Sequence, residues 1–138
     1  MSKKSSQSGL LYALGGGLAL ISIASMFAFF GGEKVLLSGN EFVEKYSTTE
    51  NAVMLDVRTP AEFASGHMAT AFNLDYENQN FTDEVKKLDS SKTYFVYCRS
   101  GNRSGKAIAI MKAQGIKNIY DLQGGIVSNK GINLITTP

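Results

Sequence analysis

The chain has 138 residues, of which 43% are hydrophobic and 19% are charged, and its formal net charge at pH 7 is +2. This length provides one domain of ordinary size with a short appendage and excludes an enzyme with two full cores. A single cysteine excludes an intramolecular disulfide and a multi-cysteine zinc or iron–sulfur site. A single histidine excludes a His-rich metal cage, so we expect no metal and no organic cofactor.

The first 32 residues differ in character from the rest of the chain. No charged residue occurs from Ser5 to Gly32, and the run from Gly9 to Phe30 is apolar. As a helix this run would rise about 33 Å, enough to cross a hydrocarbon core of about 30 Å. We interpret residues 1–32 as one hydrophobic helix that serves as an uncleaved transmembrane anchor. The alternative is a signal segment that is cut after Ala24.

Charge indicates the orientation of this segment. Lys3 and Lys4 precede the apolar run, and the positive-inside rule then keeps the N-terminus in the cytoplasm. We therefore expect the domain formed by residues 33–138 outside the cytoplasm, in the periplasm if the source is a Gram-negative bacterium. It would be membrane-anchored, or secreted or periplasmic after signal cleavage. Because these two lysines account for the whole net charge, the domain is neutral, and we expect no nucleic-acid partner.

Residues 33–138 show strands that alternate with helices. Ser38 with Glu41 forms the pattern of a capping box, and Thr59 with Pro60 is typical of a helix start. In chain order we expect a strand over 35–37, a helix after Ser38, a strand over 52–57, a short helix from Pro60 to about Ser65, a short strand over 71–74, a helix over 83–88, a strand over 93–98, a helix over 104–114, a strand over 118–122 and a weak last helix. This order predicts an α/β fold with a mostly parallel central sheet flanked by helices.

Cys98 is the candidate nucleophile. It ends an apolar strand and is followed by Arg99, Ser100, Gly101, Asn102, Arg103 and Ser104, at which the next helix begins. Parallel sheets bind ligands at the carboxyl ends of their strands, and a glycine-containing loop before a helix N-terminus can direct several N–H groups toward an anion. The same field and two arginines favour the thiolate, so no histidine base is needed. The alternative is that Cys98 is a small buried hydrophobic residue.

Three blocks of the sequence resemble the rhodanese family of sulfurtransferases, in its single-domain form. They are MLDVRTPAEFASGHMATAFNL (54–74), YFVYCRSGNRSGKAI (94–108) and NIYDLQGGI (118–126). The resemblance implies a rhodanese-like fold over residues 33–138. It also implies that Cys98 takes the outer sulfur of thiosulfate or a similar small anionic donor, becomes a persulfide, and passes the sulfur to a thiol or cyanide acceptor.

The resemblance assigns roles around Cys98. The backbone amides from Arg99 to Ser104 would hold the persulfide and the donor anion, Arg103 would position that anion, and Arg99 would tune the substrate. Four residues separate Cys98 from Arg103, whereas phosphatases of the same fold have five, so the loop favours sulfur transfer. Two alternatives remain: a persulfide relay or binding module for a partner protein, without turnover, and a phosphatase or arsenate reductase of this fold.

Other matching positions have supporting interpretations. Asp56 and Arg58, two residues apart at a strand end, form an ion pair or contact the substrate. His67 is a packing residue or a base, and Glu62 is solvated or paired at a hinge. Gly124 and Gly125 indicate a close backbone crossing and not a nucleotide loop. Asn129 and Asn133 stand where the family often has a tryptophan and a proline, which leaves substrate selectivity open.

Overall fold

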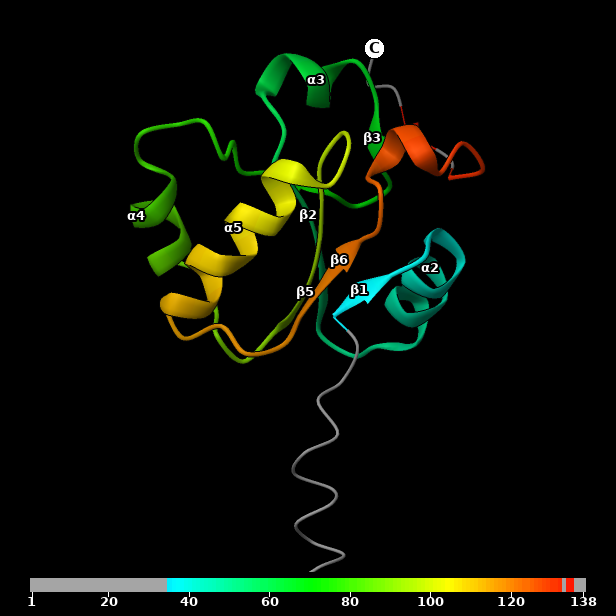
Figure 1. Ribbon diagram of the computed structural model, residues 1–138. Helices are drawn as coiled ribbons and strands as arrows, with labels where there is room; N and C mark the ends of the chain where they lie inside the picture. The colour runs from blue at the N-terminus through cyan, green and yellow to red at the C-terminus, as the bar shows by residue number, and fades with distance from the viewer. Residues whose placement is uncertain (1–34, 133, 136–138) are drawn as a thin grey trace, which may run out of the picture. The chain divides into compact units, whose positions relative to one another are not determined.

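Five parallel strands form the central sheet of the domain (Figure 1). The computed structural model describes residues 35–132 and 134–135. The order of the strands across the sheet is β1-β6-β5-β2-β4. Their bounds are Leu36–Leu37 for β1, Ala52–Asp56 for β2, Phe72–Asn73 for β4, Thr93–Tyr97 for β5 and Ile119–Leu122 for β6. The near-continuous apolar runs of β2 and β5 place these two strands side by side in the middle of the sheet.

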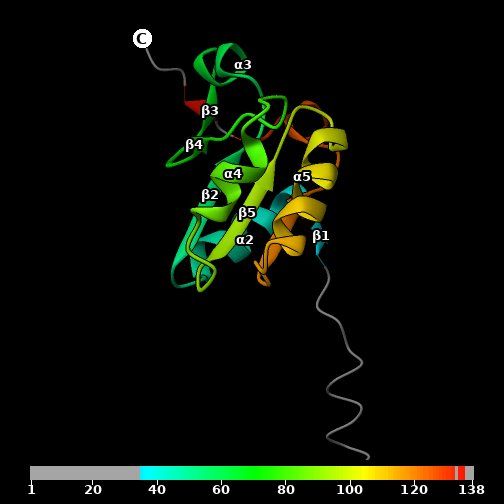
Figure 2. The same ribbon diagram turned by 90° about the vertical axis from the view of Figure 1, so that its left-hand side faces the viewer.

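Helices cover both faces of this sheet. Figure 2 shows α4 and α5 on one side of the strands, with α2 behind them. The bounds are Gly39–Thr48 for α2, Pro60–Ala64 for α3, Phe81–Lys86 for α4 and Asn102–Ala113 for α5. The predicted α/β fold with a mostly parallel sheet is therefore confirmed.

Each face of the sheet has its own apolar core. On the α5 side, Val96 and Cys98 of the β5 segment pack with Ala107 and Met111. On the α2 side, Phe42 meets Phe95 edge to face, with ring centroids 5.4 Å apart. Side chains alternate between the two faces along β5 and β6, as the pleat of a strand requires. Alternation therefore decides which residues of these strands face α5.

The helix starts follow the sequence closely. Ser38 forms the predicted capping box with Glu41, and Thr59 caps α3 before Pro60 as predicted. Glu62 completes a second capping box with Thr59, which was not predicted. The helix α5 begins at Asn102, two residues before the expected start, because Gly101 adopts the left-handed conformation at φ +97° and turns the chain directly into the helix. The weak last helix is a single 3₁₀ turn, η1 (Ile126–Ser128).

A second, two-stranded sheet was not expected. It pairs β3 (His67–Met68) with β7 (Leu134–Ile135) in antiparallel fashion. The predicted anchor over residues 9–30 and the position of Asn133 lie outside the described residues. Within the part that is described, no helix is both long enough and apolar enough to cross a bilayer.

Candidate active site

Cys98 lies directly after β5, at the base of a three-residue turn that leads into α5. Its side chain is buried, with 1% of the residue exposed. The backbone N–H of Gly101 donates a hydrogen bond to Cys98 Sγ over 3.0 Å. Gly101 itself has a positive φ, a region that favours glycine, and the chain turns there into α5. The turn therefore places a fixed donor at the atom predicted to be the nucleophile.

Ser104 is the second group at the sulfur. It is fully buried in the first turn of α5, and its Oγ accepts from the Cys98 thiol over 3.5 Å. The same hydroxyl donates to the carbonyl oxygen of Gly101 over 3.2 Å. Ser104 thus connects the sulfur with the loop backbone. The structure brings Cys98, Gly101 and Ser104 together, whereas Arg99, Ser100 and Asn102 are exposed residues of the same segment.

Gly124 and Gly125 form the predicted backbone crossing beneath this loop. Gly125 has φ +61°, and a Cβ atom there would collide with the carbonyl group of Arg99. After the crossing, the N–H groups of Ile126 and Val127 donate to the carbonyl oxygens of Cys98 and Arg99 over 3.1 and 3.0 Å. The segment that contains Gly125 therefore fixes the loop after β5 by hydrogen bonds. Its backbone lies so close to Arg99 that position 125 has no room for a side chain.

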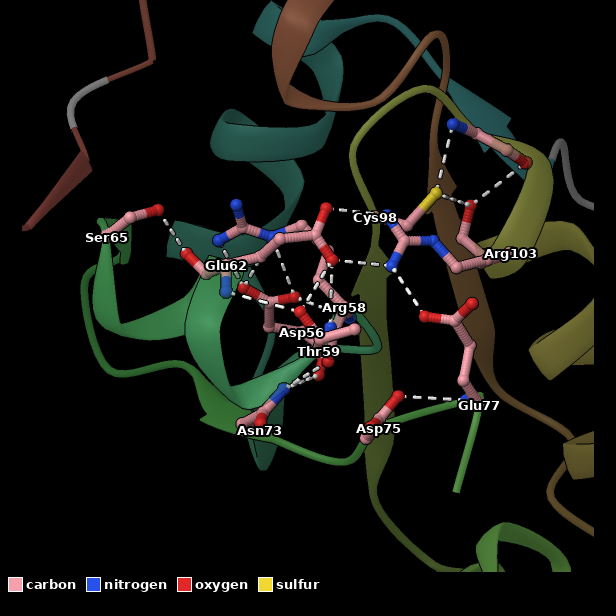
Figure 3. Close-up of polar contacts among 12 residues, drawn as sticks. Asp56, Arg58, Thr59, Glu62, Ser65, Asn73, Asp75, Glu77, Cys98 and Arg103 are labelled. Carbon is pink, nitrogen blue, oxygen red and sulfur yellow. Dashed lines mark hydrogen bonds and ion pairs between the residues drawn. The ribbon is translucent and has the colours of Figure 1, made fainter. Parts of the chain in front are cut away.

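Arg103 points toward α3 and forms a bidentate ion pair with Glu62, as Figure 3 shows. The two hydrogen bonds measure 2.6 and 2.8 Å, and Glu77 lies 3.5 Å from the same guanidinium. The hydrogen bond from Arg103 lowers the pKa of Glu62 to about 2, and the bond to Glu62 raises the pKa of Arg103. The guanidinium expected to hold an anion is thus fixed by carboxylates of this chain. Sequence reasoning missed this pair, because 41 residues separate its partners.

Asp56 and Arg58 form a buried ion pair. Arg58 Nη2 lies 2.6 Å from Asp56 Oδ2 and also donates to the carbonyl oxygen of Gly66 over 2.7 Å. Asp56 is completely buried and Arg58 is 3% exposed. The pair joins the end of β2 to the turn after α3, so these contacts support the ion-pair interpretation of the two.

His67 packs against α3. Its ring stacks on Phe63 with centroids 3.7 Å apart, and its Nδ1 lies 2.9 Å from the carbonyl oxygen of Phe63. Of the two interpretations, these contacts are those of a packing residue. Asn129 Nδ2 donates to the carbonyl oxygens of Gln123 and Gly125 over 2.9 and 2.7 Å. The Asn129 amide therefore holds the backbone on both sides of Gly124.

Comparisons with known proteins place the chain in a family. Thiosulfate sulfurtransferase GlpE of Pseudomonas entomophila is 37% identical over 76 residues, which cover 55% of this chain and 68% of that protein. A protein of Allochromatium vinosum named Sulfurtransferase is 32% identical over 85 residues, which cover 62% of this chain and 78% of that protein. The crystal structure of a rhodanese-related protein from Thermoplasma volcanium superposes with a TM-score of 0.65 and 28% identity, covering 75% of this chain and all of that one.

The family assignment rests on residues 40–130, which match the family model of the rhodanese-like domain. This range includes the loop after β5, the Glu62–Arg103 pair and the glycine crossing. Because the match spans more than half of the chain and agrees with the relatives named as sulfurtransferases, the protein belongs to the rhodanese-like domain family.

Proposed function

We propose that this protein is a rhodanese-type sulfurtransferase that moves a sulfane sulfur from thiosulfate or a similar donor to a thiol or cyanide through a persulfide on Cys98. The observation that carries the proposal is the loop after β5, where the Gly101 N–H donates to Cys98 Sγ over 3.0 Å. A backbone N–H aimed at sulfur stabilises a thiolate more than a thiol, because hydrogen bonds to charged acceptors are the stronger ones. The relatives named as sulfurtransferases support the same reaction.

The first half-reaction loads the enzyme. The Cys98 thiolate attacks the outer sulfur of thiosulfate and forms a new S–S bond. The bond between the two sulfurs of thiosulfate breaks, and sulfite leaves with its electron pair. Cys98 then carries a persulfide anion, which the loop N–H groups from Arg99 to Ser104 would hold.

The second half-reaction unloads it. A cyanide ion or a thiolate attacks the terminal sulfur of the persulfide, the S–S bond breaks, and Cys98 Sγ leaves as a thiolate. Thiocyanate or a persulfide of the acceptor is the product. Because Cys98 is the one cysteine of the chain, a thiol acceptor would come from another molecule.

Arg103 has fewer N–H groups available for the donor anion than an unpaired arginine would have. Two of its donors are engaged by Glu62, so it would contribute a fixed positive charge and its remaining N–H groups to the donor anion. Arg99 is exposed at the start of the loop and would tune the choice of donor. The short loop, with Arg103 already in the first turn of α5, favours this reaction over phosphate chemistry.

The test uses the full chain, purified in a mild detergent, with thiosulfate as the sulfur donor. We expect intact mass spectrometry to show one added sulfur per chain, which cyanide removes as thiocyanate. The Cys98→Ser variant should take up none, and uptake by that variant would contradict the role of Cys98. A wild-type protein that remains unloaded, under conditions that load an established rhodanese, would contradict the enzyme proposal.

The same preparation separates the alternatives. Loading followed by a single transfer, with no repeated turnover on free thiosulfate and cyanide, would identify a relay module. Hydrolysis of a phosphate ester that requires Cys98 would identify a phosphatase of this fold.

We also propose that residues 9–30 anchor the enzyme in a membrane, with the catalytic domain outside the cytoplasm. The charge-free apolar run and the two lysines before it support this location. Sequencing the N-terminus of the protein extracted from membranes checks it: an intact start supports an anchor, and a start at Ser25 indicates signal cleavage. Recovery of the protein in the cytoplasmic fraction would contradict both.

A further inference from the structure

Asp121 is a buried carboxylate in the middle of the sheet. It lies in β6, opposite Leu36 of β1 and Val96 of β5. Tyr120 and Leu122 belong to the core on the α2 side and Ile119 to the core on the α5 side. By alternation Asp121 therefore faces α5, the side on which Cys98 also lies. Only 7% of the residue is exposed.

One oxygen of this carboxylate is unsatisfied. Asp121 Oδ1 is buried and has no hydrogen-bond partner among the residues that the structure describes. Buried polar groups are almost always hydrogen-bonded, because desolvating them without a partner is costly. An aliphatic side chain at this position would avoid that cost, since its neighbours on both adjacent strands are Leu36 and Val96. Packing alone therefore does not account for an aspartate here.

Ser104 connects this carboxylate with the candidate nucleophile. The Ser104 hydroxyl accepts from the Cys98 thiol over 3.5 Å. Burial raises the pKa of Asp121, and the proximity of the Ser104 side chain and of the Leu122 backbone offsets part of that rise. A hydroxyl both accepts and donates, and rotation about its Cβ–Oγ bond can redirect its single hydrogen from the carbonyl of Gly101 to Asp121.

We propose that Asp121 is a positioning residue that shares a proton with Cys98 through the hydroxyl of Ser104. This inference deepens the proposed sulfurtransferase function and rests on it for its purpose. It gives the single cysteine a proton acceptor in a domain whose one histidine packs against Phe63 instead.

The proposed proton transfer involves Cys98, Ser104 and Asp121 alone. The S–H bond of Cys98 breaks and its proton goes to Ser104 Oγ, while the original Ser104 proton goes to the Asp121 carboxylate. A thiol beside a carboxylate thereby becomes a thiolate beside a carboxylic acid, with no change in total charge. The Ser104 hydroxyl then donates to the thiolate, which is the form that attacks the sulfur donor.

The other ionisable groups near Asp121 are few. The strand β1 carries none, and the groups on β5 and α5 are Tyr94, Tyr97, Arg103, Lys106 and Lys112. The Tyr94 hydroxyl bonds the carbonyl of Asp89, Tyr97 belongs to the core on the α2 side, and Arg103 pairs with Glu62. Lys106 and Lys112 are exposed. Cys98 is the group with which Asp121 shares a hydroxyl.

The test titrates the thiolate of the full chain by its ultraviolet absorbance, with the spectrum of the Cys98→Ser protein subtracted. Two groups that share a proton titrate in two coupled steps. The thiolate of Asp121→Asn should therefore appear in a single titration step. In the wild type we expect the thiolate to begin to appear at lower pH than in this variant and to reach its plateau at higher pH. At about pH 6 the wild type should hold severalfold more thiolate than Asp121→Asn, and a tenfold excess would correspond to a difference of about one unit in the pKa of the first step.

Ser104→Ala is the second variant. It should also lose the thiolate at low pH, and Asp121→Asn combined with Ser104→Ala should lose little more than either change alone. Asp83→Asn makes the same carboxylate-to-amide change on the exposed surface and should leave the curve unchanged. Circular dichroism monitors the fold. A curve for Asp121→Asn that coincides with the wild type, or that moves as a whole to lower pH, would overturn the proposal.

Sulfur loading distinguishes this failure from a failure of the proposed function. If the wild type takes no sulfur from thiosulfate but shows the two-step titration, the enzyme proposal fails and the proton sharing stands. If Asp121→Asn loads sulfur with the rate and pH dependence of the wild type and shows the same thiolate curve, the proton sharing fails and the enzyme proposal stands.

Discussion

Arg103 in the first turn of α5 donates hydrogen bonds to both carboxylate oxygens of Glu62 in α3. Glu62 also accepts from the backbone N–H and the hydroxyl of Thr59, so the carboxylate that completes the capping box of α3 also holds Arg103. The short helix α3 is therefore tied to the helix that follows the loop. The position of α3 depends on an ion pair that responds to pH.

Glu62→Gln should lower the free energy of unfolding at neutral pH by about 1 kcal/mol, the upper end for partly exposed ion pairs. The pKa of Glu62 lies at about 2 in the folded chain, below its ordinary value of 4.5. The stabilisation is therefore complete above about pH 4.5 and is lost as the pH falls toward 2. Urea unfolding of both proteins at several pH values measures it. A stability difference that stays constant across this range would contradict the ion-pair explanation, and Asp83→Asn serves as the exposed control.

Gly125→Ala should destabilise the domain by about 2 kcal/mol or more and should abolish sulfur loading. The added Cβ would meet the carbonyl group of Arg99, and alanine is strained at φ +61°. The loop would have to move away from η1 and lose the two hydrogen bonds from Ile126 and Val127. Urea unfolding and intact mass spectrometry after thiosulfate treatment check this. A variant with wild-type stability and loading would show that the crossing does not hold the loop.

Gly105→Ala is expected to act in the opposite direction. Gly105 lies inside α5, and a Cβ there would meet no atom within 4 Å. Alanine in a helix interior is more favourable than glycine by about 1 kcal/mol, so the free energy of unfolding should rise by that amount. Thermal and urea unfolding measure it. Gly105→Ala and Gly125→Ala add the same methyl group at different places. If Gly105→Ala also lowered the free energy of unfolding, α5 would not tolerate alanine at this position.

Asp56→Asn should cost about 3 kcal/mol of unfolding free energy, because it leaves the buried guanidinium of Arg58 without its counterion. The loss of unfolding free energy should be much smaller in Asp83→Asn, because Asp83 and its partner Lys86 are both exposed. Chemical denaturation of both variants provides the comparison. Equal effects at the two positions would contradict a structural role for the buried pair.

Local patterns in the sequence were sufficient for much of the fold. The Ser38 and Thr59 caps and the apolar runs of β2 and β5 depend on residues that are neighbours in the chain. Such features follow from backbone propensity and hydrogen-bonding capacity, which a sequence displays directly. The resemblance of the loop around Cys98 to the rhodanese family then placed the candidate site.

Contacts between distant segments could not be predicted in this way. Two such contacts are the ion pair of Arg103 with Glu62 and the pairing of β3 with β7. Both depend on how the chain folds back on itself, and no local sequence pattern indicates them. Asp121 is different, because a charged residue inside the apolar run of β6 was visible in the sequence. Its burial on the α5 side of the sheet, where Ser104 contacts Cys98, became evident only in the structure.

The burial of Cys98 bears on which oxidants can reach its thiol. With 1% of the residue exposed, the resting thiol is shielded from disulfides that are too bulky to enter the loop. The added sulfur atom of a persulfide would extend this side chain by about 2 Å. The atom that an acceptor has to reach would therefore lie one bond length beyond a sulfur that the fold keeps covered.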